Sequence, residues 1–574
     1  MKLSAFILCG LQSCPLAAGS NNAEAQPPTD ELIVHLDYAS YRGSHNGSSA
    51  INSWLGIQYA SPPIGPLRFQ APQEPKLQSN LKEVISATSF ENFAQCPQAG
   101  LLEPQADVGA EDCLYLSVQS PANASSLPVF VWIHGGGFQN GNGKIDFAPF
   151  IEQGQSSFVV VSIQYRLNTF GFLASPDVRQ YGTLNAGLLD QKKALEWVQK
   201  YIHLFGGNAR RVTIGGESAG AASIYYHTTA LGGTLGNSLW TGSILSSAAV
   251  VKPYHFTTAP VVRPYYRLVN AVGCLSSQQA FNCLVDAPFE TLQNASNLIS
   301  ISEIYSVPPF NPVVDDDTYL LTSPSDQLQR GPINGAFALV GNQANEGFDF
   351  VPIPSIKNPL FPLPLNTSSN LQAYVEYLFP LLSPGLAQQA ISHYSNLKSL
   401  KDFSFDDNLA ESLPHEIAIN ILGETTFYCP SEWLSLSLQK AWRYQFAIPP
   451  ALHASDLAIY EPTNITGNGN PGQNISNSFR SAFLATWTSF INTWDPSSSD
   501  AIRDWPLFTA ESPLMLNFNT TGATVEATYE LGGAKLPQAV GGTNNFSLVN
   551  EFEWQGGRGS RCDFWRGLGR LLPT

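Results

Sequence analysis

The chain has 574 residues, of which 43% are hydrophobic and 11% aromatic, enough for a large buried core. Its formal net charge of −16 argues against a nucleic-acid partner, which would require a basic face. Length alone would allow roughly two to four domains of average size, but there is no internal repeat or long low-complexity linker to divide them.

Residues 1–19 have the features of a secretory signal peptide. Lys2 precedes the apolar run Leu3–Leu8, and the small residues Ala17–Gly19 close the segment. The apolar run is too short to span a bilayer, and no later segment reaches that length without charges. A disordered start is the alternative interpretation. We predict a secreted protein with no stable membrane anchor.

A buried strand over Pro128–Ile133 leads into a glycine-rich turn. The turn reads His134-Gly135-Gly136-Gly137-Phe138. Three glycines allow the backbone to curl so that successive amides point inward, as in the H-G-G-G turn that stabilises an oxyanion in lipases and esterases. Most glycine-rich turns have no catalytic role, but this one follows a strand and lies upstream of a candidate nucleophile.

That nucleophile is Ser218, at the centre of a G-x-S-x-G pattern over Gly216–Gly220. Arg211–Ile214 predicts a strand before it and Ala219–Ile224 a helix after it. A sharp strand-to-helix turn of this kind exposes a serine and needs small flanking residues. A serine hydroxyl is a weak nucleophile alone, so a histidine base and an orienting carboxylate must lie beside it.

In proteins whose nucleophilic serine stands at such a strand-to-helix turn, the acid and the base follow the serine along the chain, each just after a strand. The strand predicted over Ala336–Val340 leads to two candidate acids, Glu346 and Asp349. The strand predicted over Trp442–Ala447 leads to His453, whereas His415 lacks a preceding strand and is expected at a helix start.

Four segments in order along the chain are similar to signature sequences of one family. They are Gly56–Phe69, Glu111–Leu116, Asn185–Gln191 and Phe205–Gly220. Together they resemble the type-B carboxylesterase/lipase family, which also contains the cholinesterases, and the character is closest to secreted fungal members. The resemblance implies an α/β-hydrolase fold, in which a large, mostly parallel central sheet is flanked by helices and carries long insertions. It also implies a single catalytic domain over residues 20–574.

The resemblance assigns roles to individual residues. It selects Glu346 as the acid and His453 as the base, and it implies the ion pairs Arg68–Glu111 and Arg166–Asp190. Ser247 aligns with a buried serine behind the catalytic residues, although the family's glycine before it is missing. The expected site consists of the nucleophile, base and acid, and of three oxyanion donors: Ser218, His453, Glu346, Gly136, Gly137 and Ala219.

Six cysteines remain after the signal segment, and they allow fifteen pairings. The family places bridges that correspond here to Cys96–Cys113 and Cys274–Cys283. Cys429 with Cys562 would be the third, long-range bridge. Eight Asn-x-Ser/Thr sites are candidates for glycosylation in a secreted protein: Asn46, Asn123, Asn294, Asn366, Asn464, Asn474, Asn519 and Asn545.

The loop closed by the first bridge bears on the substrate. In this family it forms a mobile lid in lipases and carries a choline-binding tryptophan in cholinesterases. The 16 residues between Cys96 and Cys113 include no aromatic side chain and are short for a lid. We therefore expect activity on soluble or short-chain esters, without preference for choline esters.

The sequence thus predicts a secreted carboxylic ester hydrolase that acts on small-molecule esters through an acyl-enzyme. No metal or organic cofactor is implied, and the oligomeric state is left open. Three alternatives stay open: a true lipase on long-chain acylglycerols, an acyltransferase that uses the same acyl-enzyme, and a non-catalytic binding or adhesion member. The last would lack part of the triad, and comparing hydrolysis with alcoholysis of one activated ester would identify an acyltransferase.

Overall fold

The computed structural model describes residues 32–80, 83–100, 108–276, 279–302, 307–356, 358–397, 412–461, 475–498, 502–531 and 534–573. The signal segment 1–19, the glycosylation candidates Asn464 and Asn474, and residues 101–107 of the predicted short loop lie outside these ranges. Of the other candidates, Asn46, Asn123, Asn294, Asn366 and Asn545 are exposed and Asn519 is half-buried. Their modification stays a prediction.

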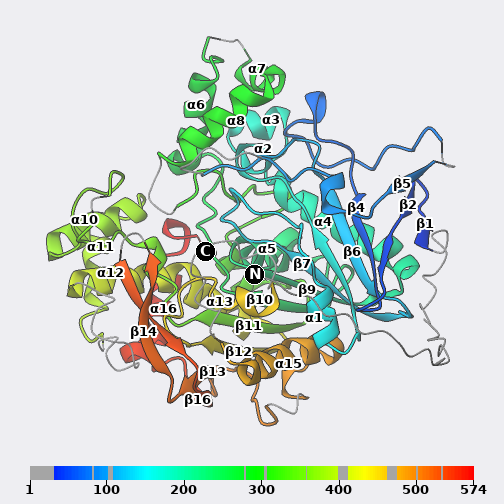
Figure 1. Ribbon diagram of the computed structural model, residues 1–574. Coiled ribbons are helices and arrows are strands. Elements are labelled where there is room, and N and C mark those ends of the chain that lie inside the picture. Colours follow the sequence, from blue (N-terminus) through cyan, green and yellow to red (C-terminus); the bar gives the residue numbers. More distant parts are fainter. Residues whose placement is uncertain are drawn as a thin grey trace, which may run out of the picture.

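An eleven-stranded sheet crosses the centre of the molecule (Figure 1). Its strand order is β16-β13-β12-β11-β10-β9-β7-β8-β6-β4-β3. In chain order the strands are β3 (Ser44–Asn46), β4 (Ile51–Gln58), β6 (Tyr115–Pro121), β7 (Leu127–Ile133), β8 (Val159–Ile163), β9 (Gly207–Glu217), β10 (Gly242–Ser246), β11 (Phe337–Gln343), β12 (Lys440–Phe446), β13 (Leu514–Thr521) and β16 (Thr543–Asn550).

The middle of this sheet is parallel. Strands β7 to β13 pair in parallel, and only β3, β4, β6 and β16 at the two edges pair antiparallel. Parallel strands are covered on both faces and therefore have continuous apolar sequences, as in Val159-Val160-Val161 of β8, which is buried throughout. The predicted α/β-hydrolase architecture with a mostly parallel sheet is confirmed.

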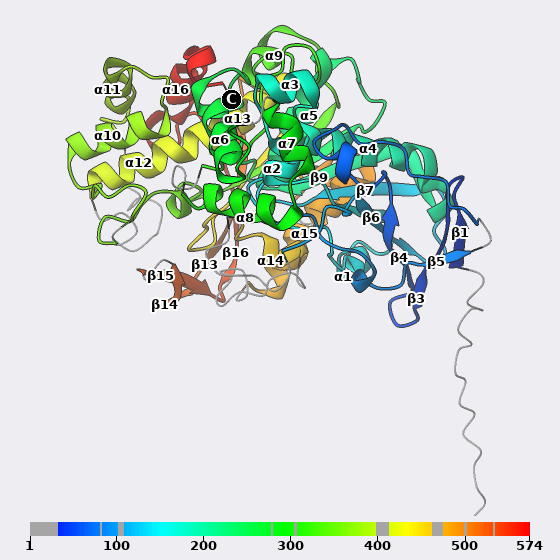
Figure 2. The same ribbon diagram turned by 90° about the horizontal axis from the view of Figure 1, so that it is seen from above.

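Helices cover both faces of the sheet (Figure 2). On one face α4 (Ala186–Tyr201) packs on β9, and α5 (Ala219–Thr229) packs on β7, β9 and β10. On the same face α13 (Cys429–Ser437) packs on β11 and β12. On the other face lie α1 (Ala148–Gln153) and α15 (Asn477–Thr493). The described helices include none that is long and apolar enough to cross a membrane.

Long insertions extend two of the crossovers, and they form two helical lobes at the top and the left of Figure 1. Between β10 and β11 the chain forms α6 (Ala259–Ala271), α7 (Ala280–Asp286), α8 (Phe289–Ser300) and α9 (Pro324–Arg330). Between β11 and β12 it forms α10 (Ser368–Leu378), α11 (Pro384–Ser392) and α12 (Leu413–Gly423) before α13. His415 lies at the start of α12, where its N–H donates to the capping Ser412 hydroxyl, as expected.

The remaining elements are short or peripheral. They are α2 (Asn168–Phe172), α3 (Pro176–Tyr181), α14 (Leu457–Tyr460), α16 (Trp554–Gly567), the small sheet of β1 (Ile33–His35), β2 (Ser40–Arg42) and β5 (Val84–Ser86), and the hairpin of β14 (Thr524–Leu531) and β15 (Ala534–Val540).

Three disulfides join Cys96 to Cys113, Cys274 to Cys283, and Cys429 to Cys562, the pairs expected from the sequence. The expected ion pairs are also present, with Nε–Oε1 2.6 Å for Arg68–Glu111 and Nη2–Oδ1 2.7 Å for Arg166–Asp190. Asp315 is buried and accepts hydrogen bonds from the Asn185 amide and the Tyr319 backbone.

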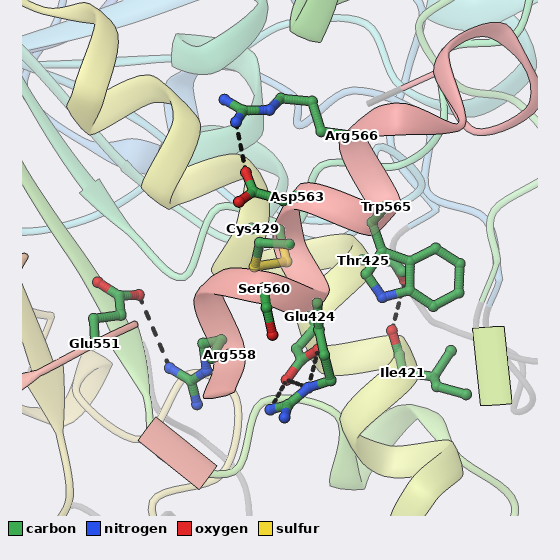
Figure 3. Close-up of a disulfide and its surroundings, with 12 residues drawn as sticks. Ile421, Glu424, Thr425, Cys429, Glu551, Arg558, Ser560, Asp563, Trp565 and Arg566 are labelled. Carbon is green, nitrogen blue, oxygen red and sulfur yellow. Dashed lines mark hydrogen bonds and ion pairs between the residues drawn. A yellow bond between two sulfur atoms is a disulfide. The ribbon is translucent and has the colours of Figure 1, made fainter. Parts of the chain in front are cut away.

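The C-terminal helix α16 is fixed to the insertion between β11 and β12. Cys562 bridges to Cys429 at the start of α13, as Figure 3 shows. The chain just before that cysteine is a π-helical turn, Glu424–Tyr428. Arg561 of α16 donates to the Glu424 carboxylate at 2.6 Å, and the Arg558 guanidinium lies 3.9 Å from the centroid of the Tyr428 ring. Because both guanidinium groups are buried, α16 holds this turn in one place.

Arg561→Met should destabilise the protein strongly, since it leaves the buried Glu424 carboxylate without its partner. We expect a loss of about 3–5 kcal/mol in the free energy of unfolding, measured in urea with disulfides intact. Lys200→Met removes a charge from the exposed pair with Asp37 and should cost about 0–1 kcal/mol. Equal effects of the two changes would contradict the anchoring role of α16.

Candidate active site

Ser218 lies at a sharp turn between β9 and α5, with φ 55° and ψ −120°. The turn needs small residues because the end of β7 passes directly behind it. A Cβ on Gly220 would lie 2.0 Å from the Ile133 carbonyl oxygen, closer than any side chain can approach. Parallel pairing of β7 with β9 therefore brings the glycine-rich turn 134–138 beside the serine.

The three residues expected to cooperate lie in one hydrogen-bonded chain. His453 Nε2 is 2.8 Å from Ser218 Oγ, and His453 Nδ1 is 2.7 Å from Glu346 Oε2. Ser218 follows β9, Glu346 follows β11, and His453 follows β12, so all three stand at the carboxyl ends of parallel strands. The imidazole packs against Phe350 and Phe427, whose ring centroids are 5.0 and 4.9 Å away.

Glu346 is fully buried and held on several sides. Its Oε1 accepts a hydrogen bond from the Gln343 N–H at 2.7 Å, and its own N–H donates to the Tyr428 hydroxyl at 3.2 Å. Tyr428 belongs to the turn fixed by α16 and donates to the carbonyls of residues 343 and 344. The competing Asp349 does not belong to the chain of hydrogen bonds that leads to Ser218. Burial raises the pKa of the Asp349 carboxyl to about 7. When ionised, this carboxylate favours the protonated form of His453.

The glycine-rich turn has the shape that an oxyanion site requires. Gly136 and Gly137 have φ 99° and 63°, a region that favours glycine. A Cβ on Gly136 would meet the Asn140 carbonyl at 2.0 Å, so this backbone conformation admits no larger residue. Within the described chain, no hydrogen bond occupies the N–H groups of Gly136, Gly137 or Ala219. Three donors are thus available near Ser218.

Glu217, next to the nucleophile, was not expected from the sequence. Its Oε1 lies 3.3 Å from His453 Nε2 and accepts no hydrogen bond in the part of the chain described. Burial raises the pKa of the Glu217 carboxyl well above its usual range. Burial by itself disfavours the imidazolium of His453, but the carboxylates of Glu217 and Glu346 outweigh it and raise the pKa of the ring.

Two adjacent buried serines, Ser246 and Ser247, stand at the end of β10. Ser246 Oγ donates to Asp456 Oδ2 at 2.6 Å, three residues beyond His453. Ser247, the serine expected behind the triad, is also buried and has φ 54°, in the region that favours glycine. The sequence did not predict the contact between Ser246 and Asp456.

Ser218 and His453 line a cavity of about 740 Å³. Its walls are mostly apolar and come from the oxyanion turn, from the segment after β10, and from both helical insertions. The aromatic and aliphatic side chains on them include Phe138, Phe172, Phe310, Phe379, Leu381 and Leu422. A cavity of this size and character suits a small organic substrate. The described residues contain no cluster of three or more histidine, cysteine or acidic side chains suited to a metal.

Two solved structures with the same architecture are esterases. EstA of Aspergillus niger superposes with a TM-score of 0.75 and 25% identity, covering 94% of this chain and 99% of that one. A thermophilic pNB esterase superposes with a TM-score of 0.70 and 26% identity, covering 91% and 98%.

Sequence comparison gives the same result. The chain is 28% identical to secreted lipase 1 of Botryotinia fuckeliana, covering 94% of this chain and 99% of the lipase. It is 27% identical to cocaine esterase of Oryctolagus cuniculus, covering 80% and 86%. A model of the carboxylesterase family matches residues 30–532. This chain therefore belongs to the carboxylesterase family and is a carboxylic ester hydrolase.

Proposed function

We propose that the protein is a secreted serine esterase in which Ser218, His453 and Glu346 form the catalytic triad. The observation that carries this proposal is the hydrogen-bonded chain from Ser218 Oγ through the imidazole to Glu346, open to the cavity at Ser218. The predicted signal segment, the three disulfides and the secreted relative support secretion.

In this mechanism Ser218 Oγ attacks the ester carbonyl carbon while His453 Nε2 takes the hydroxyl proton. Negative charge develops on the carbonyl oxygen, and the N–H groups of Gly136, Gly137 and Ala219 stabilise it. His453 then donates its proton to the departing alkoxide, which leaves as the alcohol. A water molecule attacks the acyl-enzyme by the same route, and the carboxylic acid leaves. Glu346 orients the ring and stabilises the imidazolium throughout.

We further propose that the substrates are soluble or short-chain esters. The short loop between Cys96 and Cys113 supports this proposal, as does the volume of about 740 Å³ of the cavity at the site. The secreted lipase among the relatives favours the rival, a lipase acting on long-chain acylglycerols.

Ser218→Ala should lower kcat by several orders of magnitude and leave the melting temperature close to that of the wild type, because the triad acts as a unit. Glu346→Gln should also lower kcat severely, since a neutral amide no longer stabilises the imidazolium. Asp349→Asn is the matched control and should have a milder effect. If Asp349→Asn were the crippling change and Glu346→Gln the mild one, the acid would be Asp349.

Glu217→Gln should move the acid limb of the pH profile of kcat/KM to lower pH. His453 is active as a base only when deprotonated, and the Glu217 carboxylate favours its protonated form. Removing that charge lowers the pKa of the ring, so the active form persists to lower pH. Glu196→Gln on α4, outside the cavity, should leave the profile unchanged. An unmoved acid limb in Glu217→Gln would mean that Glu217 is uncharged in the working enzyme.

Activity on an ester such as tributyrin should rise smoothly as its concentration passes the solubility limit. A site without a lid gains nothing from a lipid surface, whereas a lidded lipase is activated there. Rates measured by titration of released acid, with a matched series of soluble p-nitrophenyl esters, distinguish the two. A sharp rise at the emulsion threshold would identify a lipase.

A further inference from the structure

Lys252 lines the catalytic cavity without belonging to the triad. It ends a segment that follows β10 and passes the nucleophile. The Ala249 N–H donates to the Ser218 carbonyl at 3.1 Å, and the Val250 N–H donates to the Thr426 carbonyl at 2.9 Å. The backbone thereby fixes Lys252 between the reacting serine and the turn held by α16.

The surroundings of the Lys252 amine are almost entirely apolar. Its Nζ donates to Thr426 Oγ1 at 2.8 Å and lies 5.3 Å from the centroid of the Phe379 ring. No carboxylate pairs with it in the part of the chain that the structure describes. An ammonium has three N–H donors, so two remain available to a ligand in the cavity.

The fully buried arginines in the described part of the chain have a counter-charge. Arg166, Arg443 and Arg561 pair with Asp190, Glu551 and Glu424, respectively. The half-buried Lys252 has none, and burial lowers the pKa of its amine to about 7. A charge without a partner in an apolar cavity is costly, so the position is one where a bound anion would stabilise the protonated amine.

Among the described residues that line the cavity, none offers a spare carboxylate to serve as that anion. The ionisable wall residues of the cavity are Glu217, Lys252, Arg263 and His453, apart from Tyr254. Glu217 is engaged with the imidazole at 3.3 Å. The Lys252 ammonium is therefore a positive charge at the cavity wall that favours an anionic group in the substrate.

We propose that Lys252 is a specificity-determining residue that binds a free carboxylate carried by the ester substrate. The preferred substrates are then esters of small organic acids that bear one ester and one carboxylate, such as half-esters of dicarboxylic acids. This inference rests on the proposed function, because it places the carboxylate relative to an ester that Ser218 attacks. The ammonium would hold it by charge-assisted hydrogen bonds.

Matched pairs of substrates test the proposal on the wild-type enzyme. Monomethyl adipate and methyl hexanoate have acyl chains of equal length and differ by the terminal carboxylate. The pair of 3-acetoxybenzoate and phenyl acetate places the carboxylate on the leaving group instead. We expect kcat/KM to favour the anionic member of at least one pair on the order of 10- to 100-fold, the range of a hydrogen bond to a charged group.

Lys252→Met keeps the length of the side chain and removes its charge, so it should abolish that preference, chiefly by raising KM for the anionic ester. Lys252→Arg should retain part of the preference. Lys440→Met is the matched control, because Lys440 also lies over an aromatic ring, Phe337, but is exposed and outside the cavity. This control should keep the wild-type ratio.

A wild-type enzyme without preference in either pair would overturn the proposal, as would a Lys252→Met variant that loses activity equally on both members of the favoured pair. The second outcome would identify Lys252 as structural. Failure of the proposed function has a different signature: no pair would be hydrolysed, or Ser218→Ala would retain turnover, and both proposals would then fall.

Discussion

The site depends on the close approach of three backbone segments at the carboxyl edge of the sheet: the turn after β9, the end of β7, and the glycine-rich turn 134–138 that follows β7. The turn after β9 presses against the end of β7 so tightly that Gly220 has no room for a side chain beside the Ile133 carbonyl. This contact exposes Ser218 and at the same time brings Gly136 and Gly137 next to it. The nucleophile and the oxyanion donors are therefore consequences of one packing arrangement.

The acid and the base depend on a second packing contact, which residues near the C-terminal end of the chain help to form. Tyr428 holds the turn that carries Glu346, and Phe427 packs on His453. Both residues belong to the π-helical turn Glu424–Tyr428, which α16 fixes through Arg561 and the Cys429–Cys562 bridge (Figure 3). π-Helical turns are common at functional sites. Here the last helix of the chain stabilises residues that act more than a hundred positions earlier.

Much of this organisation could be predicted from the sequence, because it depends on local patterns. Apolar strands followed by turns mark Ser218, Glu346 and His453, and the structure brings these three side chains together. The Ser246–Asp456 contact could not be predicted, because adjacent serines are indistinguishable without a backbone angle. Glu217 and Lys252 were missed for another reason. Glu217 matters because it lies beside the imidazole of His453, and Lys252 because no carboxylate of the described chain pairs with it at the cavity. No sequence pattern records either arrangement.

The contrast between buried cations shows how the same chemistry serves stability and specificity. Arg561 has a carboxylate partner, so its charge is neutralised and the contact anchors a helix. Lys252 lies at the cavity without one, so its charge is available to a ligand. A charge neutralised away from the cavity therefore stabilises the fold, whereas a charge at the cavity wall without a carboxylate partner can bind a ligand.

The central claim is that Ser218 forms a covalent intermediate with the substrate. Mass spectrometry of the protein after treatment with an aryl phosphonate, which transfers its phosphonyl group to an activated serine, tests this claim most directly. The account predicts one phosphonyl group per chain, attached to Ser218 on peptide mapping, with loss of esterase activity in proportion to labelling. Full inactivation with the adduct on another residue, or hydrolysis that persists after Ser218 is fully labelled, would contradict it.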